Sequence, residues 1–218
     1  MSTTICFDFG NTRLKAAIFK GNQLEKLELL ENDAIASVQK LLDQYKPSKT
    51  LLSSVIHHDK AIESLLTNYG PFHLLGPQTK LNFTTPVGKP ETIGADRLGL
   101  VAAAVDLYPA EHSLVICLGT CITYNFVNNR GQFLGGSISP GMQMRFKSMN
   151  DLTALLPLIE PAPSFGLVGY DTKTNLLSGV VVGVCAAKNF INYSDVATNT
   201  KIKPQIKGGV RSYFFTKI

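Results

Sequence analysis

The stretch TTICFDFGNT, residues 3–12, decides the fold expected for this chain. Its apolar, β-branched and aromatic residues predict a strand, which Gly10-Asn11-Thr12 ends in a tight turn. The same pattern returns in SLVICLGTC, residues 113–121, where Gly119 and Thr120 again follow a buried strand. Because each turn leads into a further apolar strand, the repeat predicts two related lobes that face each other.

Strand and helix patterns alternate on both sides of these turns. We expect strands at residues 3–9, 14–19, 23–29, 50–56, 72–75, 113–118, 121–127 and 132–134, and helices at residues 34–45, 60–68, 94–108, 142–152 and 173–190. Residues 76–93 are rich in proline and predict an irregular loop. The alternation predicts an α/β protein, with one domain in residues 1–110 and a second in residues 111–218.

The composition is that of a folded protein with a sizeable core. The chain has 218 residues, of which 44% are hydrophobic and 17% are charged. A net charge of +5 favours an anionic small molecule as ligand, but the basic residues are too scattered to form a nucleic-acid-binding stripe. We therefore expect no nucleic-acid partner.

We also expect neither a targeting signal nor a membrane partner. The N-terminal residues lack a basic region and run straight into the first strand. Residues 177–187, the most apolar stretch, fall short of the ~20 residues that span a bilayer. No CxxC motif occurs among the four cysteines, which are Cys6, Cys117, Cys121 and Cys185. We therefore expect them to be reduced thiols in the core of a cytoplasmic protein.

The two glycine turns are suited to hold a phosphate tail. Glycine lets backbone N–H groups approach an anion without a Cβ in the way, and a Thr or Asn side chain supplies a further donor. A single turn of this kind is more often a plain hairpin.

Two aspartates stand where they could carry chemistry. Asp8 ends an apolar strand, where a carboxylate is costly to bury unless it is paired or binds a cation; it either holds Mg²⁺ through water or caps the turn. Asp96 lies in Gly94-Ala-Asp-Arg97 at a predicted helix start. It is either an N-cap or a base for an alcohol, with Arg97 gripping a substrate carboxylate or phosphate.

Two further segments place glycine beside polar residues. GGSISPG, residues 135–141, predicts a stiff loop that is either a plain connection or packed closely against a ligand or another loop. Gly169-Tyr-Asp-Thr172 opens the last helix, with Asp171 or Thr172 first of all as its N-cap.

Taken together, these motifs resemble the type III pantothenate kinases in order and approximate spacing. They are Asp8-x-Gly-Asn-Thr12, Gly94-Ala-Asp-Arg97, Gly119-Thr120, Gly135-Gly-x-Ile-x-Pro-Gly141, and Gly169-x-Asp-Thr172 with Ser178-Gly179. The resemblance covers residues 3 to about 190. It implies two ribonuclease-H-like lobes of the acetate-and-sugar-kinase, actin-like fold. It also implies ATP-dependent phosphorylation of pantothenate to 4′-phosphopantothenate, the first step of coenzyme A synthesis.

The resemblance further assigns roles to single residues. The segment that would bind the ATP phosphates and Mg²⁺ comprises Asp8, Phe9, Gly10, Asn11, Thr12, Arg13, Leu14 and Lys15, with Gly119 and Thr120 contributed by the second lobe. Asp8 would hold the Mg²⁺. Asp96 would be the general base, with Gly94, Ala95 and Arg97 around pantothenate. Thr172 would reach pantothenate across a homodimer interface.

The chain departs from the family pattern in three places. Cys117 replaces the aspartate associated with a monovalent cation, K⁺ or NH₄⁺, and a thiol is a poor ligand for such an ion. That site is therefore either absent or rebuilt from backbone carbonyls. Val87 and Phe83 stand near the place of an aromatic residue that covers the substrate. Residues 194–218 lack the pattern of a closing helix, so the second lobe is expected to be divergent or truncated at its C-terminus.

Two other functions compete with the kinase. A catalytically impaired regulatory or binding homologue would keep the dimer and lose turnover, as Cys117 and the tail suggest. A nuclease on a ribonuclease-H-like fold would need several clustered carboxylates for two metals, and only Asp8 and Asp96 are candidates. Intact Asp8, Asp96 and Arg97 favour the kinase.

Overall fold

The computed structural model describes residues 1–31, 34–162 and 164–189. The described residues form two compact units. One comprises residues 1–111 with 127–135, and the other comprises residues 112–126 with the described residues from 136 onward. A domain boundary between residues 110 and 111 stays a prediction.

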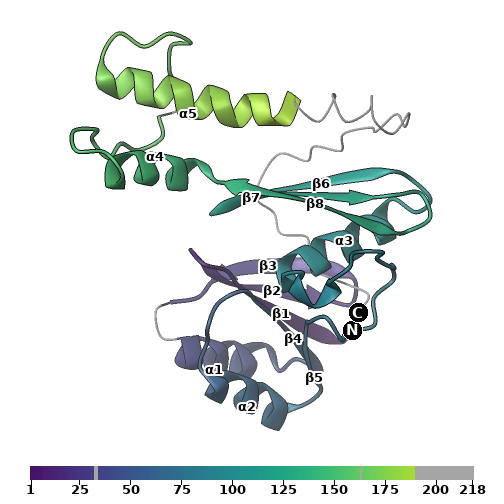
Figure 1. Cartoon of the computed structure of the whole chain (residues 1–218). Helices are drawn as coiled ribbons and strands as arrows, with labels where there is room; N and C mark the ends of the chain where they lie inside the picture. Colours follow the sequence, from purple (N-terminus) through teal and green to yellow (C-terminus); the bar gives the residue numbers. More distant parts are fainter. Residues whose placement is uncertain (32–33, 163, 190–218) are drawn as a thin grey trace. The chain divides into compact units, whose positions relative to one another are not determined.

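A five-stranded sheet forms the centre of the first unit (Figure 1). Its strands are β1 (Thr3–Phe9), β2 (Leu14–Lys20), β3 (Gln23–Leu29), β4 (Lys49–Ser54) and β5 (Phe72–Leu74). They lie in the order β3-β2-β1-β4-β5, with β1, β2 and β3 antiparallel and β4 and β5 parallel to β1. This topology confirms the ribonuclease-H-like lobe expected from the sequence.

Helices cover both faces of that sheet, because side chains alternate along each strand. Ile5, Phe7 and Phe9 of β1 pack in one core with α1 (Ala34–Tyr45) and α2 (Lys60–Tyr69). Cys6 packs in a second core with Ala95 of α3 (Ala95–Leu107). By the same alternation, Asp8 lies on the α3 side of the sheet.

The second unit holds most of a three-stranded sheet and two helices. The strands are β6 (Ser113–Leu118), β7 (Cys121–Val127) and β8 (Phe133–Pro140), in that order. The helices α4 (Met142–Asp151) and α5 (Thr172–Asn189) share a core built around Phe146, Leu177 and Val180. Leu114, Ile122 and Tyr124 form a second core, against which Val184 of α5 packs. The repeated strand–turn–strand pattern therefore opens this unit as well.

The prediction of a loop at residues 135–141 is wrong. Residues 135–140 continue β8, and only Gly141 lies between that strand and α4. Gly135 has a φ of +111°, a backbone conformation that other residues avoid. Glycine is therefore favoured at this position of the strand. The predicted loop at residues 76–93 also contains a short 3₁₀ turn, Pro90–Thr92.

The cysteines are only partly core residues. All four are free thiols, but only Cys6 is buried, and Cys185 is exposed. Burial raises the pKa of the Cys6 thiol to about 12, which keeps it protonated and inert. In the part of the chain that the structure describes, no helix is long and apolar enough to cross a membrane. The expected divergence of residues 194–218 lies outside the described residues.

Candidate active site

Asp8 lies near the end of β1, just before the turn at residues 10–12, which we call the phosphate-type turn. It is paired in register with Lys15 of β2 and Ser53 of β4. Its Oδ2 atom lies 3.4 Å from the Lys15 ammonium, and only 17% of its side chain is exposed. Burial raises the pKa of Asp8, Lys15 opposes that shift, and the negative charge of Asp96 adds to it. Asp8 and Asp96 are therefore near enough to sense each other's charge.

The turn after Asp8 presents its backbone and small side chains to solvent. The Gly10 N–H donates to the Arg13 carbonyl at 3.2 Å, which closes the turn, and Asn11, Thr12 and Arg13 are exposed. Phe9 is fully buried in the core under α1 and α2, so only its backbone could reach a ligand. Leu14 is also packed against that core.

Asp96 occupies the first turn of α3, beside a glycine that makes room for its carboxylate. The Asp96 Oδ1 atom accepts a hydrogen bond from the Arg97 N–H at 2.8 Å. A Cβ placed on Gly94 would lie 2.7 Å from that oxygen, which is closer than van der Waals contact permits. Gly94 caps α3 without a side-chain hydrogen bond, and Ala95 is buried. The Asp96 carboxylate thus keeps its position only while residue 94 is glycine.

Arg97 lies over an aromatic platform. Its guanidinium carbon is 5.5 Å from the centroid of the Phe133 ring, which itself meets Phe83 edge-on. Burial lowers the pKa of Arg97, and Asp96 acts in the opposite direction. Because an arginine pKa starts so high, the guanidinium remains a cation that can grip an anionic group.

Gly119 and Thr120 belong to the other unit, where they join β6 to β7. The Gly141 N–H donates to the Thr120 carbonyl at 2.9 Å. A Cβ on Gly141 would overlap the Gly119 carbonyl oxygen, so this turn is packed directly against the start of α4. Cys117 is half-buried on β6, two residues ahead of Gly119.

Thr172 is the first residue of α5, and Asp171 caps the helix as expected. The Asp171 carboxylate accepts from the Thr174 N–H at 2.7 Å, and its hydrogen bonds to Thr174 lower the pKa of Asp171. Thr172 lines a hollow of about 590 Å³ between α4 and α5, together with Arg145 and Asn175. Arg145 is held by Ser139 and by the Pro140 carbonyl.

Sequence reasoning missed two residues of the first unit. Ser53 is 2% exposed, and among the described residues its hydroxyl has no hydrogen-bond partner. It stands beside Asp8 in register, and the two serines that follow Leu51 and Leu52 at the end of β4 were the available signal. Phe133 was missed because nothing local connects it to Arg97.

The Asp8 carboxylate is better suited to hold a metal ion through water molecules than to form part of a site made only of protein ligands. Within the described residues, no three His, Cys, Asp or Glu side chains gather to hold a metal ion. A buried carboxylate of raised pKa beside an unpartnered hydroxyl is, however, a suitable place for a hydrated cation. Mg²⁺ commonly keeps several waters and binds through one or two carboxylates and substrate phosphates.

An α/β protein in which one aspartate ends a strand before a glycine turn and a second aspartate opens a nearby helix has the features of a small-molecule kinase. A solved structure described as a Baf family transcriptional activator from Campylobacter jejuni is similar in fold. Its TM-score is 0.53 at 20% identity, over 92% of this chain and 80% of that one.

The type III pantothenate kinase family model matches residues 4–192. A type III pantothenate kinase of Christiangramia forsetii is 40% identical over 83% of this chain and 75% of its own length. One from Bacteroides fragilis is 34% identical over 83% of this chain and 74% of its own length. The chain belongs to the type III pantothenate kinase family.

Proposed function

We propose that this chain transfers the terminal phosphoryl group of ATP to the hydroxyl of pantothenate, with Asp96 as the general base. The family match over residues 4–192 supports the reaction class. The observation that carries the residue roles is the position of Asp96 at the start of α3, within electrostatic reach of Asp8. One acid is thereby available for the alcohol and the other for the phosphates.

The nucleotide phosphates would bind along the turn from Asp8 to Lys15. The exposed turn supplies backbone N–H groups and the Thr12 hydroxyl, and Lys15 supplies a positive charge. Gly119 and Thr120 stay predicted nucleotide contacts, on the resemblance to the family. Phosphoryl transfer depends mainly on positioning and on charge neutralisation, and these groups provide both.

Mg²⁺ is the metal that the donor set favours. Asp8 would hold it through water, and Ser53 offers its unpartnered hydroxyl to the same hydration shell. When bound, the metal would neutralise charge on the ATP phosphates. The pKa of Asp8, which burial raises, would fall once a cation replaced the missing solvation.

Pantothenate carries a carboxylate, for which Arg97 is the fitting partner. The Phe133 ring limits the freedom of the guanidinium, so the two N–H donors needed for bidentate contact are preorganised. Gly94 and Ala95 add close backbone around the substrate. The Asp96 carboxylate then accepts the proton that the substrate hydroxyl loses.

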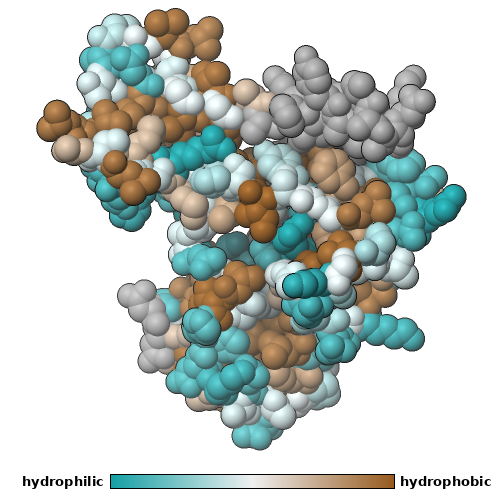
Figure 2. Space-filling model, in the orientation of Figure 1, coloured by the Kyte–Doolittle hydropathy of each residue, from teal (hydrophilic) through white to brown (hydrophobic). Residues whose placement is uncertain are grey.

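A homodimer would complete this site through Thr172. The second unit exposes large apolar side chains (Figure 2), including Leu152, Leu155, Leu158, Leu167 and Val168. An exposed apolar patch of this kind marks an interaction surface. A second copy of the chain is the proposed occupant, which would bring Thr172 of one protomer to the pantothenate of the other. The four free thiols fit a cytoplasmic location.

The activity should depend only weakly on K⁺ or NH₄⁺. A neutral thiol at Cys117 offers no charged oxygen to such a cation. Replacing K⁺ with a bulky organic cation at constant ionic strength should change the rate by less than about twofold, whereas a larger loss would show that a cation site exists.

The proposed function is tested by ADP release with pantothenate against a panel of other small alcohols. Turnover with Mg²⁺-ATP should be selective for pantothenate and should yield 4′-phosphopantothenate by mass spectrometry. A chain that binds nucleotide but phosphorylates none of these alcohols would instead be a catalytically impaired homologue.

A further inference from the structure

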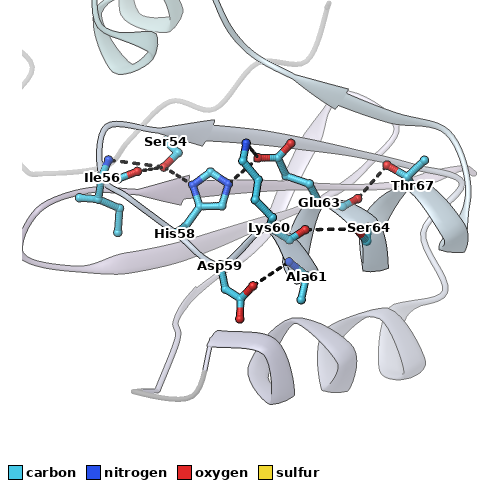
Figure 3. A network of polar contacts seen from close by, with 9 residues as sticks. All are labelled: Ser54, Ile56, His58, Asp59, Lys60, Ala61, Glu63, Ser64 and Thr67. Carbon is cyan, nitrogen blue, oxygen red and sulfur yellow. Dashed lines mark hydrogen bonds and ion pairs between the residues drawn. The ribbon is translucent and has the colours of Figure 1, made fainter.

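A polar bridge connects the end of β4 to the start of α2 (Figure 3). The Ser54 hydroxyl oxygen lies 2.9 Å from Nδ1 of His58, and Nε2 of His58 lies 2.9 Å from Oε1 of Glu63. Glu63 belongs to the first turn of α2. Because a carboxylate only accepts, Nε2 carries the hydrogen of that contact, and the ring joins two separate elements.

The bridge is shielded from solvent. Only 11% of the His58 side chain and 21% of the Glu63 side chain are exposed. The Ser54 hydroxyl has one hydrogen, which it donates either to Nδ1 of His58 or to the Ile56 carbonyl oxygen 3.0 Å away, and both contacts keep Ser54 close to the residues that follow it. Hydrogen bonds with this little access to water are stronger than surface ones, so the bridge holds residues 54–58 in one conformation.

Residues 54–58 contact the phosphate-type turn through Phe9. The His58 ring meets the Phe9 ring edge-on, with centroids 5.9 Å apart. The Val55 N–H donates to the Phe9 carbonyl at 3.0 Å, as the last bond of the β1–β4 ladder. Phe9 is the residue immediately before Gly10. Its ring and its carbonyl are thus both held by the segment that His58 fixes.

We propose that His58, bridged between Ser54 and Glu63, is a positioning residue that fixes the nucleotide-phosphate turn through Phe9. The contacts of His58 are with Ser54, Glu63 and Phe9, and its role does not require contact with substrate. Its contribution is to hold the strand end from which Gly10, Asn11 and Thr12 project. This inference rests on the proposed function, which supplies ATP as the nucleotide. Replacing His58 should therefore weaken the binding of ATP.

The test compares His58→Asn and Ser54→Ala with Lys60→Ala as the matched control. Asparagine is too short to reach Glu63, and alanine removes one hydroxyl with little change in shape. Lys60 pairs with the same carboxylate at 2.7 Å, but 81% of its side chain is exposed. Removing Lys60 therefore breaks an ion pair of Glu63 and leaves the His58 contacts in place.

In His58→Asn, we expect the KM for ATP to rise about tenfold and the KM for pantothenate to change less than about twofold. Ser54→Ala should raise the KM for ATP about threefold, and Lys60→Ala should leave all constants unchanged. A lower thermal midpoint with an unchanged KM for ATP would show a purely structural role and overturn the proposal. Equal increases in both KM values would overturn it as well.

Binding of Mg²⁺-ADP, measured by calorimetry, separates this proposal from the proposed function. If the natural chain shows no turnover but His58→Asn still weakens ADP binding, the positioning role stands and the kinase assignment fails. If turnover is normal and ADP binds both proteins equally, the kinase assignment stands and the positioning role fails.

Discussion

The buried Asp8 carboxylate opposes folding at neutral pH. Because burial raises its pKa, the folded state favours the protonated acid. This favourable contribution is fully present below the ordinary aspartate pKa and is lost as pH rises through the higher pKa of the folded protein. At pH 7 the ionised group therefore reduces the free energy of unfolding.

Asp8→Asn should raise the thermal midpoint at pH 7 by about 2 °C or more and lower kcat by about 100-fold or more. The gain in midpoint should shrink as the pH falls toward 4, since the raised pKa of Asp8 favours its protonation and an uncharged carboxyl resembles the asparagine amide. Scanning calorimetry at several pH values checks the first effect, and ADP release checks the second. Asp43→Asn, on the exposed side of α1, is the control. A midpoint lowered at pH 7 would contradict the account.

Single residues also mark where sequence reasoning reached its limit. The places of Asp8 at a strand end and of Gly94 and Asp96 at a helix start could be predicted because their motifs are local, and their roles stay predictions. The cap at Asp171, one of the two residues expected there, is also local. Phe9 was assigned to the ATP segment, but strand alternation turns its side chain into the opposite core. Ser53 could not be recognised, because its significance depends on lying beside Asp8 in a parallel ladder.

At the scale of elements, the start of β8 supports the start of α3. Phe133 is 1% exposed and belongs to the core that also contains Leu98 of α3. Its carbonyl accepts a hydrogen bond from Thr85 at 2.8 Å, which ties the residue 76–93 loop to the same strand. The ring is therefore held firmly under the Arg97 guanidinium.

Phe133→Leu should raise the KM for pantothenate about threefold to tenfold and leave kcat nearly unchanged, because leucine keeps apolar volume but has no ring face for the cation. Steady-state kinetics at saturating ATP measure this directly. Phe146→Leu, a buried phenylalanine of the α4–α5 core, is the matched control and should lower stability without changing that KM. An equal KM effect in both variants would contradict the platform role.

Strands with a clear alternation of apolar and polar residues could be predicted from the sequence. Strand residues that depend on pairing with a neighbouring strand could not. Strands β1, β3, β6 and β7 begin and end where alternation and turn residues place them. Residues 135–140 were expected to be a loop because glycine and proline normally interrupt strands. Their place in β8 depends on the neighbouring β7, which composition alone does not reveal.

In the proposed dimer of the whole molecule, both chains would contribute residues to each active site. Asp96 and Thr172 would then come from different protomers. Mixing Asp96→Asn with Thr172→Val, each nearly inactive alone, should restore activity through hybrid dimers that carry one intact site. At equal amounts and random exchange, about half of the dimers are hybrids, so about a quarter of the natural sites should be intact. Mixtures that never exceed the sum of the separate variants, despite proven subunit exchange, would rule out a shared site.

Asp96 is proposed to accept the proton of the pantothenate hydroxyl, and single-turnover formation of 4′-phosphopantothenate measures that step. Asp96→Asn should lower that rate by about 10²–10⁴-fold, while ATP and pantothenate still bind. Asp106→Asn, exposed near the other end of α3, should react like the natural chain. A near-normal rate in Asp96→Asn, with the product verified by mass, would contradict the account.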